Sequence, residues 1–126
     1  MKKIIDNLKK LKKYNVVAVK QSLEDEGASF EEIKIMRNIT RKSGLQHNIK
    51  VGGCEAKTDI YFCERVGVSG IVAPMVETSY GLRKFIQILI KNEKQNLYIN
   101  LESINAFKNI KKIFNSKDFK KLKGLV

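Results

Sequence analysis

The sequence contains little proline, tryptophan, cysteine or histidine: one Pro, no Trp, two Cys and one His in 126 residues. Low proline content excludes collagen-like and proline-rich chains, and two cysteines cannot form the disulfide framework of a small secreted protein. The longest apolar runs, residues 71–76 and residues 86–90 broken by Gln87, are far too short to span a membrane, and no signal-peptide stretch follows the first lysines. We therefore expect a cytoplasmic protein with two reduced thiols, Cys54 and Cys63, and no membrane partner.

Lysine, in contrast, is abundant. The chain has 25 Lys and Arg against 13 Asp and Glu, which gives a net charge of +12, and 43% hydrophobic residues are enough to build a core. This length predicts one domain over residues 1–126. Within residues 2–13, Ile4, Leu8 and Leu11 recur at helical spacing, which predicts an amphipathic helix whose apolar stripe packs on the domain.

A unit of strand, loop and helix repeats along the rest of the chain. We expect strands at residues 15–20, 47–51, 69–73, 96–100 and 122–126, and helices at residues 29–42, 56–66, 80–91 and 106–115. Ser29 and Glu32 have the spacing of a capping box at the start of the first of these helices. The strands begin roughly 25–30 residues apart, as in the βα units of a parallel sheet, and their nearly continuous apolar character predicts burial on both faces.

Two α/β architectures accommodate this repeat. One is an open, doubly wound sheet of five strands, a flavodoxin-like domain that binds a phosphorylated ligand. The other is the first half of a (β/α)₈ TIM barrel, with four βα units and a fifth strand. In both, ligands bind at the carboxyl ends of the strands, so the residues at those positions are the candidates for function.

Acidic residues gather at these strand ends. Six of the 13 acids follow the first four expected strands: Glu24, Asp25, Glu26, Glu55, Glu77 and Glu102. Like charges on one edge repel unless a cation or basic groups neutralise them, so a hard divalent metal is the natural inference. Alternatively, Glu55 and Glu77 cap the helices that follow them, whereas Glu102 directly ends an apolar strand.

The expected strand ends also carry glycines and lysines that suit an anion. Gly52 and Gly53 allow close approach to a ligand, and their amides can hold a phosphate or carboxylate, although a Gly pair is also a common tight turn. Lys50 and Lys20 lie within strands and either meet an anionic substrate or extend into solvent. His47 precedes a strand at the opposite end of the sheet, so we assign it no catalytic or ligand role.

Three segments resemble a known family: residues 50–60 (KVGGCEAKTDI), 70–78 (GIVAPMVET) and 98–103 (YINLES). They are similar to the HpcH/HpaI-type aldolase and citrate lyase family of pyruvate-binding TIM barrels, and the resemblance covers about residues 17–126. It implies a Mg²⁺- or Mn²⁺-dependent carbon–carbon lyase or aldolase acting on pyruvate-like, oxaloacetate-like or acyl-CoA-derived enolates. Glu102 matches a metal ligand of the family, and its second carboxylate ligand would follow the fifth strand, beyond Val126.

The sequence therefore predicts a lyase-type half-barrel, incomplete and weakened or inactive by itself, with a small oxo-acid as substrate and a homo-oligomeric assembly. The predicted catalytic residues are Glu26 and Lys50, where Lys50 stands nearest to the position of a family arginine; the substrate-binding residues are Gly52, Gly53 and Glu77, and the metal ligand is Glu102. The alternative is a basic module that binds a polyanion or nucleic acid through its lysine runs. Scarce arginine and the absence of a lysine stripe with stacking aromatics argue against a nucleic-acid partner.

Overall fold

The computed structural model describes residues 1–89 and 94–126, and five of its strands form one sheet in the order β1-β2-β3-β4-β5. The strands are β1 (Ala18–Ser22), β2 (Gln46–Lys50), β3 (Gly70–Ala73), β4 (Asn96–Ile99) and β5 (Gly124–Leu125). Every neighbouring pair is parallel. A doubly wound sheet reverses its strand order at a switch point, whereas this order never reverses. The chain is therefore an α/β protein with the strand order of a partial (β/α)₈ barrel, and the flavodoxin-like alternative is wrong.

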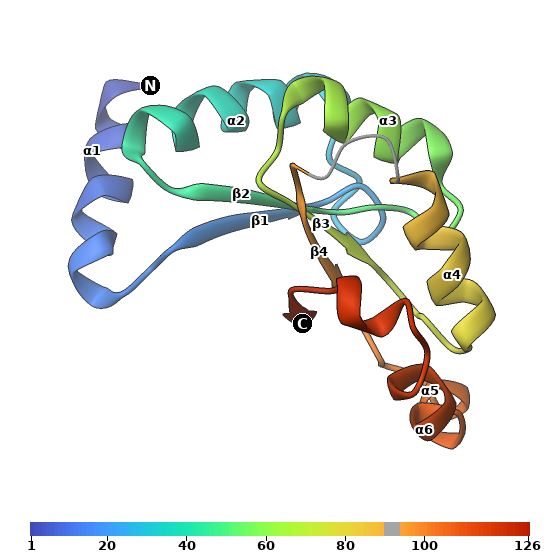
Figure 1. The fold of residues 1–126 in the computed structure, drawn as a ribbon. Coiled ribbons are helices and arrows are strands. Elements are labelled where there is room, and N and C mark those ends of the chain that lie inside the picture. Colours follow the sequence, from blue (N-terminus) through green and yellow to red (C-terminus); the bar gives the residue numbers. More distant parts are fainter. Residues whose placement is uncertain (90–93) are drawn as a thin grey trace.

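The helices that connect the strands lie along one side of the curved sheet (Figure 1). Right-handed crossovers between sequential parallel strands place successive helices on the same face, which explains this arrangement. The helices are α1 (Lys2–Leu11), α2 (Phe30–Ser43), α3 (Lys57–Val66), α4 (Ser79–Ile88), α5 (Ile104–Lys108) and α6 (Ile110–Phe114), with short 3₁₀ turns η1 (Lys12–Tyr14) and η2 (Phe119–Lys121). Among the described helices, none is long and apolar enough to cross a bilayer.

The hydrophobic core lies between this sheet and its helices. Ile49, Ile71 and Ile99 point from β2, β3 and β4 into a cluster that includes Phe85 of α4. Because side chains alternate along a strand, the residues directly before and after each of these isoleucines point to the opposite, concave face of the sheet. That face is largely polar, with Asn48, Lys50, Tyr98 and Asn96 among its residues.

Gly70 is required by the packing of this concave face. A Cβ at this position would lie 2.5 Å from the Asn48 Oδ1 atom and 2.9 Å from a ring carbon of Tyr98. Both distances are shorter than a van der Waals contact allows. The side chains of Asn48 and Tyr98 can therefore occupy the space beside position 70 only because this position lacks a side chain.

Several predicted boundaries are confirmed. Ser29 and Glu32 form the predicted capping box: the Ser29 Oγ atom accepts from the Glu32 amide at 3.2 Å, and the Glu32 carboxylate accepts from the Ser29 amide at 2.8 Å. The same helix ends at Gly44, whose φ of 71° is left-handed. The helix predicted for residues 80–91 runs from Ser79 to Ile88, and the end predicted at residue 91 lies outside the described residues.

Other predictions need correction. β1 starts at residue 18 and not at 15, because Asn15 adopts a left-handed conformation (φ 62°) that ends the preceding 3₁₀ turn. Burial on both faces is wrong for β1, where Lys20 is exposed, as is Val17 directly before the strand. The helix predicted for residues 106–115 divides into α5 and α6 at Asn109, whose φ of −99° and ψ of 4° are not helical.

The amphipathic helix predicted for residues 2–13 is present as α1 and η1. It packs on α2 beside the start of β1 (Figure 1). No residue of α1 is buried, however, and the side chains of Ile4 and Leu11 are 47% and 40% exposed. The apolar stripe therefore packs on the rest of the chain along only part of its width.

Candidate active site

Lys50 lies at the carboxyl end of the sheet, on β2, the second of its five strands. It is the last residue of β2, and its side chain is only 7% exposed. The Nζ atom lies 2.6 Å from an oxygen of Asp25 and 3.1 Å from an oxygen of Glu24, both in the loop that follows β1. The register aligns Lys50 with Ser22 at the end of β1, which brings the lysine beneath this loop.

These acids keep Lys50 charged. The hydrogen bond to Asp25 raises the pKa of Lys50 above its ordinary value, and the hydrogen bond to Glu24 and the charge of Glu102 act in the same direction. Burial acts against them and lowers the pKa, but the acids prevail. Lys50 is therefore a buried ammonium group at neutral pH and offers no lone pair to an electrophile.

The loop after β1 is held together by its own hydrogen bonds. The buried Ser22 hydroxyl oxygen accepts from the amides of Glu24 at 3.2 Å and Asp25 at 2.9 Å. The Glu26 carboxylate accepts from the Ser22 amide at 3.2 Å. Glu26, predicted as a catalytic residue, thus orders the loop that supplies the partners of Lys50; its catalytic role stays a prediction.

Glu102, the predicted metal ligand, stands at the end of β4 and is held at both oxygens. Its Oε1 atom accepts from the Met75 amide at 2.9 Å, and its Oε2 atom accepts from the Asn100 side-chain amide at 3.3 Å. Met75 has a φ of 46°, an uncommon left-handed conformation for a residue with a side chain. In this conformation the Met75 amide points toward the Glu102 carboxylate.

Asn100, which sequence reasoning missed, is 93% buried beside this carboxylate (7% exposed). Its Oδ1 atom is buried and has no hydrogen-bond partner among the described residues. Its backbone joins the loops after β3 and β4, since its amide donates to Ala73 at 3.0 Å and its carbonyl accepts from Val76 at 3.1 Å. The only signal in the sequence was a polar residue two positions before Glu102, directly after the apolar residues 97–99.

The remaining acids at the strand ends point elsewhere. Glu77 accepts from the Ser103 hydroxyl at 2.6 Å, and its backbone carbonyl accepts from the Asn109 side chain at 3.1 Å. It therefore links the loops after β3 and β4 to the start of α5, and its predicted contact with substrate stays a prediction. Glu55 pairs with Lys84 of α4 at 3.7 Å.

The predicted anion cradle at Gly52 and Gly53 is partly filled by the chain itself. The Gly52 amide donates to the Asp59 carboxylate at 2.9 Å, so an acid from the first turn of α3 occupies the place of an anionic ligand. A Cβ at Gly53 would meet nothing within 4 Å. Lys50 and Glu102 are thus close enough to interact electrostatically. The Gly52 amide, in contrast, is already bonded to Asp59 and is not free to donate to a ligand.

Lys20 and His47 lie away from this group. Lys20 is exposed on the edge strand β1, in agreement with the alternative of a solvated head. His47 is fully buried near the start of β2, where its Nε2 atom lies 3.0 Å from the Gln21 side-chain oxygen. Burial, aided by the nearby charge of Arg37, lowers the pKa of His47 to about 4, so the ring is neutral and plays no part at the carboxyl end.

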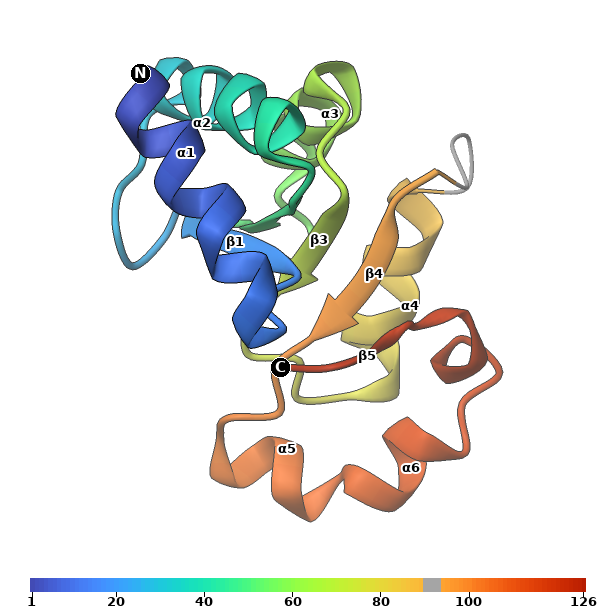
Figure 2. The same ribbon diagram turned by 90° about the vertical axis from the view of Figure 1, so that its left-hand side faces the viewer.

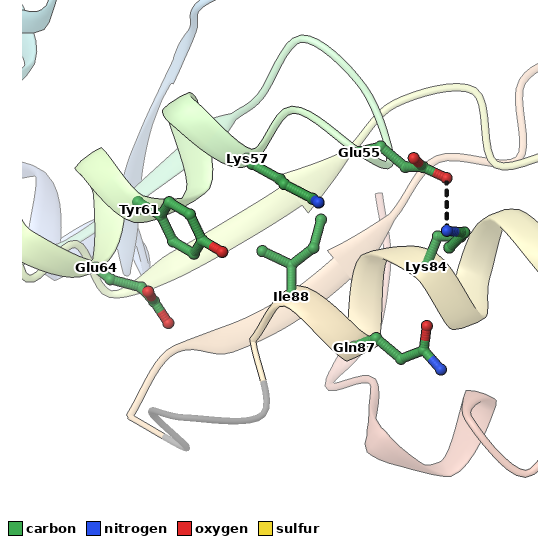
Figure 3. Close-up of a pocket in the computed structure, with 7 residues that line it drawn as sticks. All are labelled: Glu55, Lys57, Tyr61, Glu64, Lys84, Gln87 and Ile88. Carbon is green, nitrogen blue, oxygen red and sulfur yellow. Dashed lines mark ion pairs between the residues drawn. The ribbon is translucent and has the colours of Figure 1, made fainter.

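A cavity of about 420 Å³ lies outside the barrel-type sheet, between α3 and α4 (Figure 3). Glu55 and Lys84 face each other at one end of it, and Tyr61 and Glu64 line the other. It opens on the helical layer and not on Lys50, so it is separate from the candidate active site.

The charged side chains around Lys50 carry a net negative charge, which favours a bound cation over a bound anion. Lys50 contributes one positive charge and Glu24, Asp25 and Glu102 contribute three negative ones, which leaves a net charge of −2. A divalent metal would balance this charge. In residues 1–89 and 94–126, however, no three His, Cys, Asp or Glu side chains converge on one point. The described residues therefore do not complete a metal site, and the ligand role of Glu102 stays a prediction.

Comparison with known proteins bears on the fold. No family model matches the sequence, and no curated protein matches it. Among solved structures, an HpcH/HpaI aldolase/citrate lyase family protein from Burkholderia cenocepacia J2315 superposes with a TM-score of 0.78 over 96% of this chain. The two sequences are 8% identical, so the likeness shows a shared fold alone. This chain spans 58% of the length of that protein.

Proposed function

We propose that this chain forms part of a carbon–carbon lyase or aldolase that acts on a small oxo-acid through a pyruvate- or oxaloacetate-like enolate. The observation that carries the proposal is the position of Glu102, fixed at the carboxyl end of a barrel-type sheet and within electrostatic range of the buried Lys50. Barrel enzymes build their active sites at this end. The solved protein of the same fold is described as an aldolase/citrate lyase family member, which supports the same class of reaction.

The proposal includes a divalent metal, Mg²⁺ or Mn²⁺, with Glu102 as one of its ligands. The net charge of −2 around Lys50 supports a doubly charged cation, and the further ligands would come from outside the described residues. Such an ion, when bound, would supply a Lewis acid for the oxygen of the enolate. Met75 and Asn100 hold the Glu102 carboxylate in place for this role.

Lys50 has a different role in this proposal from the lysine of a Schiff-base aldolase. A Schiff base needs a neutral amine, whereas the two bound acids keep Lys50 protonated. Lys50 instead positions the loop after β1 and offsets part of the acidic charge. Reduction with borohydride in the presence of pyruvate should therefore leave no adduct on Lys50 by mass spectrometry, and an adduct there would contradict the metal-based route.

The proton exchange of pyruvate tests the proposal most directly. An enzyme that stabilises the enolate exchanges the methyl protons of pyruvate with D₂O, and proton NMR follows the loss of the methyl signal. With Mg²⁺ we expect exchange above the rate in buffer for the natural chain and for Glu31→Gln, a control on the exposed face of α2, but not for Glu102→Gln. Calorimetry should show Mg²⁺ binding with the same dependence on Glu102. Exchange equal to buffer in all three proteins, without Mg²⁺ binding, would overturn the proposal.

We place this activity in the cytoplasm as part of the same proposal. Cys54 and Cys63 are both free thiols, and burial raises the pKa of Cys63 to about 12, so it stays a protonated core residue. Neither cysteine contributes to the proposed chemistry.

A further inference from the structure

The excess positive charge of the chain is confined to two segments. Residues 1–20 contain seven lysines and one aspartate, and residues 104–126 also contain seven lysines and one aspartate. Each segment therefore carries a net charge of +6. Residues 21–103 contain eleven basic and eleven acidic residues, so the whole net charge of +12 resides in the two terminal segments.

These segments form the two open edges of the sheet. Residues 1–20, here named the β1 edge, comprise α1, η1 and the start of β1, which pairs only with β2. Residues 104–126, the β5 edge, comprise α5, α6, η2 and β5, which pairs only with β4. Figures 1 and 2 show α1 and the α5–α6 pair on separate parts of the molecule. The outward backbone groups of an edge strand can pair with another strand. On β1 the outward groups of Ser22 are already bonded to Glu26 and Ala28, so Ala18 and Lys20 are the positions left for such pairing.

Exposed apolar side chains are concentrated on the same two edges. Fifteen large hydrophobic residues in the described part of the chain are exposed, and ten of them belong to these segments. They are Met1, Ile4, Leu11, Tyr14 and Val17 on the β1 edge and Ile104, Phe107, Phe114, Leu125 and Val126 on the β5 edge. Apolar groups ringed by charge at an open sheet edge are typical of a surface that another polypeptide covers.

We propose that the β1 and β5 edges bind an acidic polypeptide that adds a parallel strand to β1. Charge complementarity requires an acidic partner, and the unpaired strand backbone requires a polypeptide that extends the sheet. Seven of the ten exposed side chains are aliphatic, which suits a protein core better than stacked bases. In the Burkholderia protein the sheet is part of a chain of which this one spans 58%, so further polypeptide accompanies this fold there.

A second copy of this chain is a poor occupant of these edges. Closing a barrel from two copies would bring the β5 edge of one against the β1 edge of the other, and each carries a charge of +6. Like charges at such a contact oppose association. A homo-oligomer that uses other surfaces stays a separate prediction.

The test uses a fluorescein-labelled peptide of alternating Glu and Val, which is acidic and forms strands. By fluorescence polarisation at physiological salt, we expect it to bind the full chain about tenfold more tightly than a Lys-Val peptide or a Glu-Gly peptide of equal length. Hydrogen exchange should slow at the outward amides of residues 18 and 20 when it binds. Val17→Asp should weaken binding about tenfold, whereas Tyr61→Asp, a matched exposed position on α3, should leave it unchanged.

Three results would overturn this proposal. Equal binding of the Glu-Val and Glu-Gly peptides would show attraction by charge alone, without strand addition. Tighter binding of a single-stranded oligonucleotide would favour the polyanion-binding alternative raised by the lysine content. Dimerisation of the chain in light scattering, abolished by Val17→Asp, would identify a second copy as the occupant. None of these results depends on pyruvate exchange, so this proposal and the proposed function can fail independently.

Discussion

His47 and Lys50 lie three residues apart on β2, and both are buried, yet their charge states are opposite. His47 meets the neutral side chain of Gln21 and the positive charge of Arg37, so burial prevails and the ring loses its proton. Lys50 meets two carboxylates, so it stays charged although burial opposes the charge. For two side chains that are both buried, the partners that each one faces decide its charge.

Removing the charge of Lys50 should have the largest effect. Lys50→Met leaves Glu24, Asp25 and Glu102 without their cation, and we expect the free energy of unfolding to fall by about 2–3 kcal/mol at neutral pH. Urea denaturation measures this loss. Lys57→Met, at an exposed position on α3, should change stability by less than about 0.5 kcal/mol. Equal stability of the two variants would show that the Lys50 ion pairs contribute nothing.

The sign of the pH dependence follows from the raised pKa of Lys50. A raised pKa in the folded state means that the ion pairs stabilise the fold fully below the ordinary lysine pKa of 10.5. Their contribution is lost as pH rises through the folded pKa. As pH rises from neutral, the stability difference between the natural chain and Lys50→Met should therefore persist until strong base.

His47 should give the next largest effect, with the opposite dependence on pH. Its pKa falls from 6.5 to about 4 on folding, so the unfolded chain binds the proton first as pH falls. This contribution to stability is present above pH 6.5 and is lost as pH falls toward 4, by about 2 kcal/mol between neutral pH and the lower part of this window. Urea titrations of the natural chain and His47→Gln should differ in slope across this window. Parallel curves would mean that His47 does not titrate differently in the two states.

Gln21→Leu tests whether the neutral ring of His47 needs its partner. The change leaves a buried ring nitrogen without a hydrogen bond, and we expect a loss of about 1 kcal/mol in the free energy of unfolding. Gln46→Leu, at an exposed position on the same sheet, is the control. A loss at Gln46 as large as that at Gln21 would assign the effect to the change of residue type.

The smallest effects should come from removing one acid at a time. The Asp25 and Glu24 side chains are 59% and 30% exposed, so Asp25→Asn or Glu24→Gln alone should cost about 0.5–1 kcal/mol. Together they leave Lys50 buried beside two neutral side chains, and the loss should exceed the sum of the two single losses. A double-mutant cycle measures this coupling, and simple additivity would contradict a shared interaction with Lys50.

Much of the fold follows from local signals in the sequence. The βα repeat and the Ser29 capping box act through neighbouring residues, and the structure has them where they are expected. The predicted start of β1 was wrong because Asn15, the first residue of the predicted strand, adopts a left-handed conformation. The β-branched residues that follow it gave no sign of this conformation. Order of strands in the sheet was left open, since both architectures share the same repeat.

The sequence predicted where the candidate site lies, but not which side chains in it contact each other. Strand-end acids could be identified from the repeat, yet only side-chain packing separates Glu102, which lies near Lys50, from Glu77, which binds Ser103. The pairing of Asp59 with the Gly52 amide was also missed. An acid in the first turn of a helix is a common feature, and nothing in its spacing shows which amide it meets.

The sequence by itself determined the repeating βα units, the start of α2 at its capping box and the net charge, because these depend on residue type and on neighbours along the chain. Only the tertiary structure decided the strand order, the buried ion pairs of Lys50 and the neutral state of His47. Those properties depend on which side chains of distant segments face each other, and a difference of one residue in register sends a side chain to the other face of the sheet.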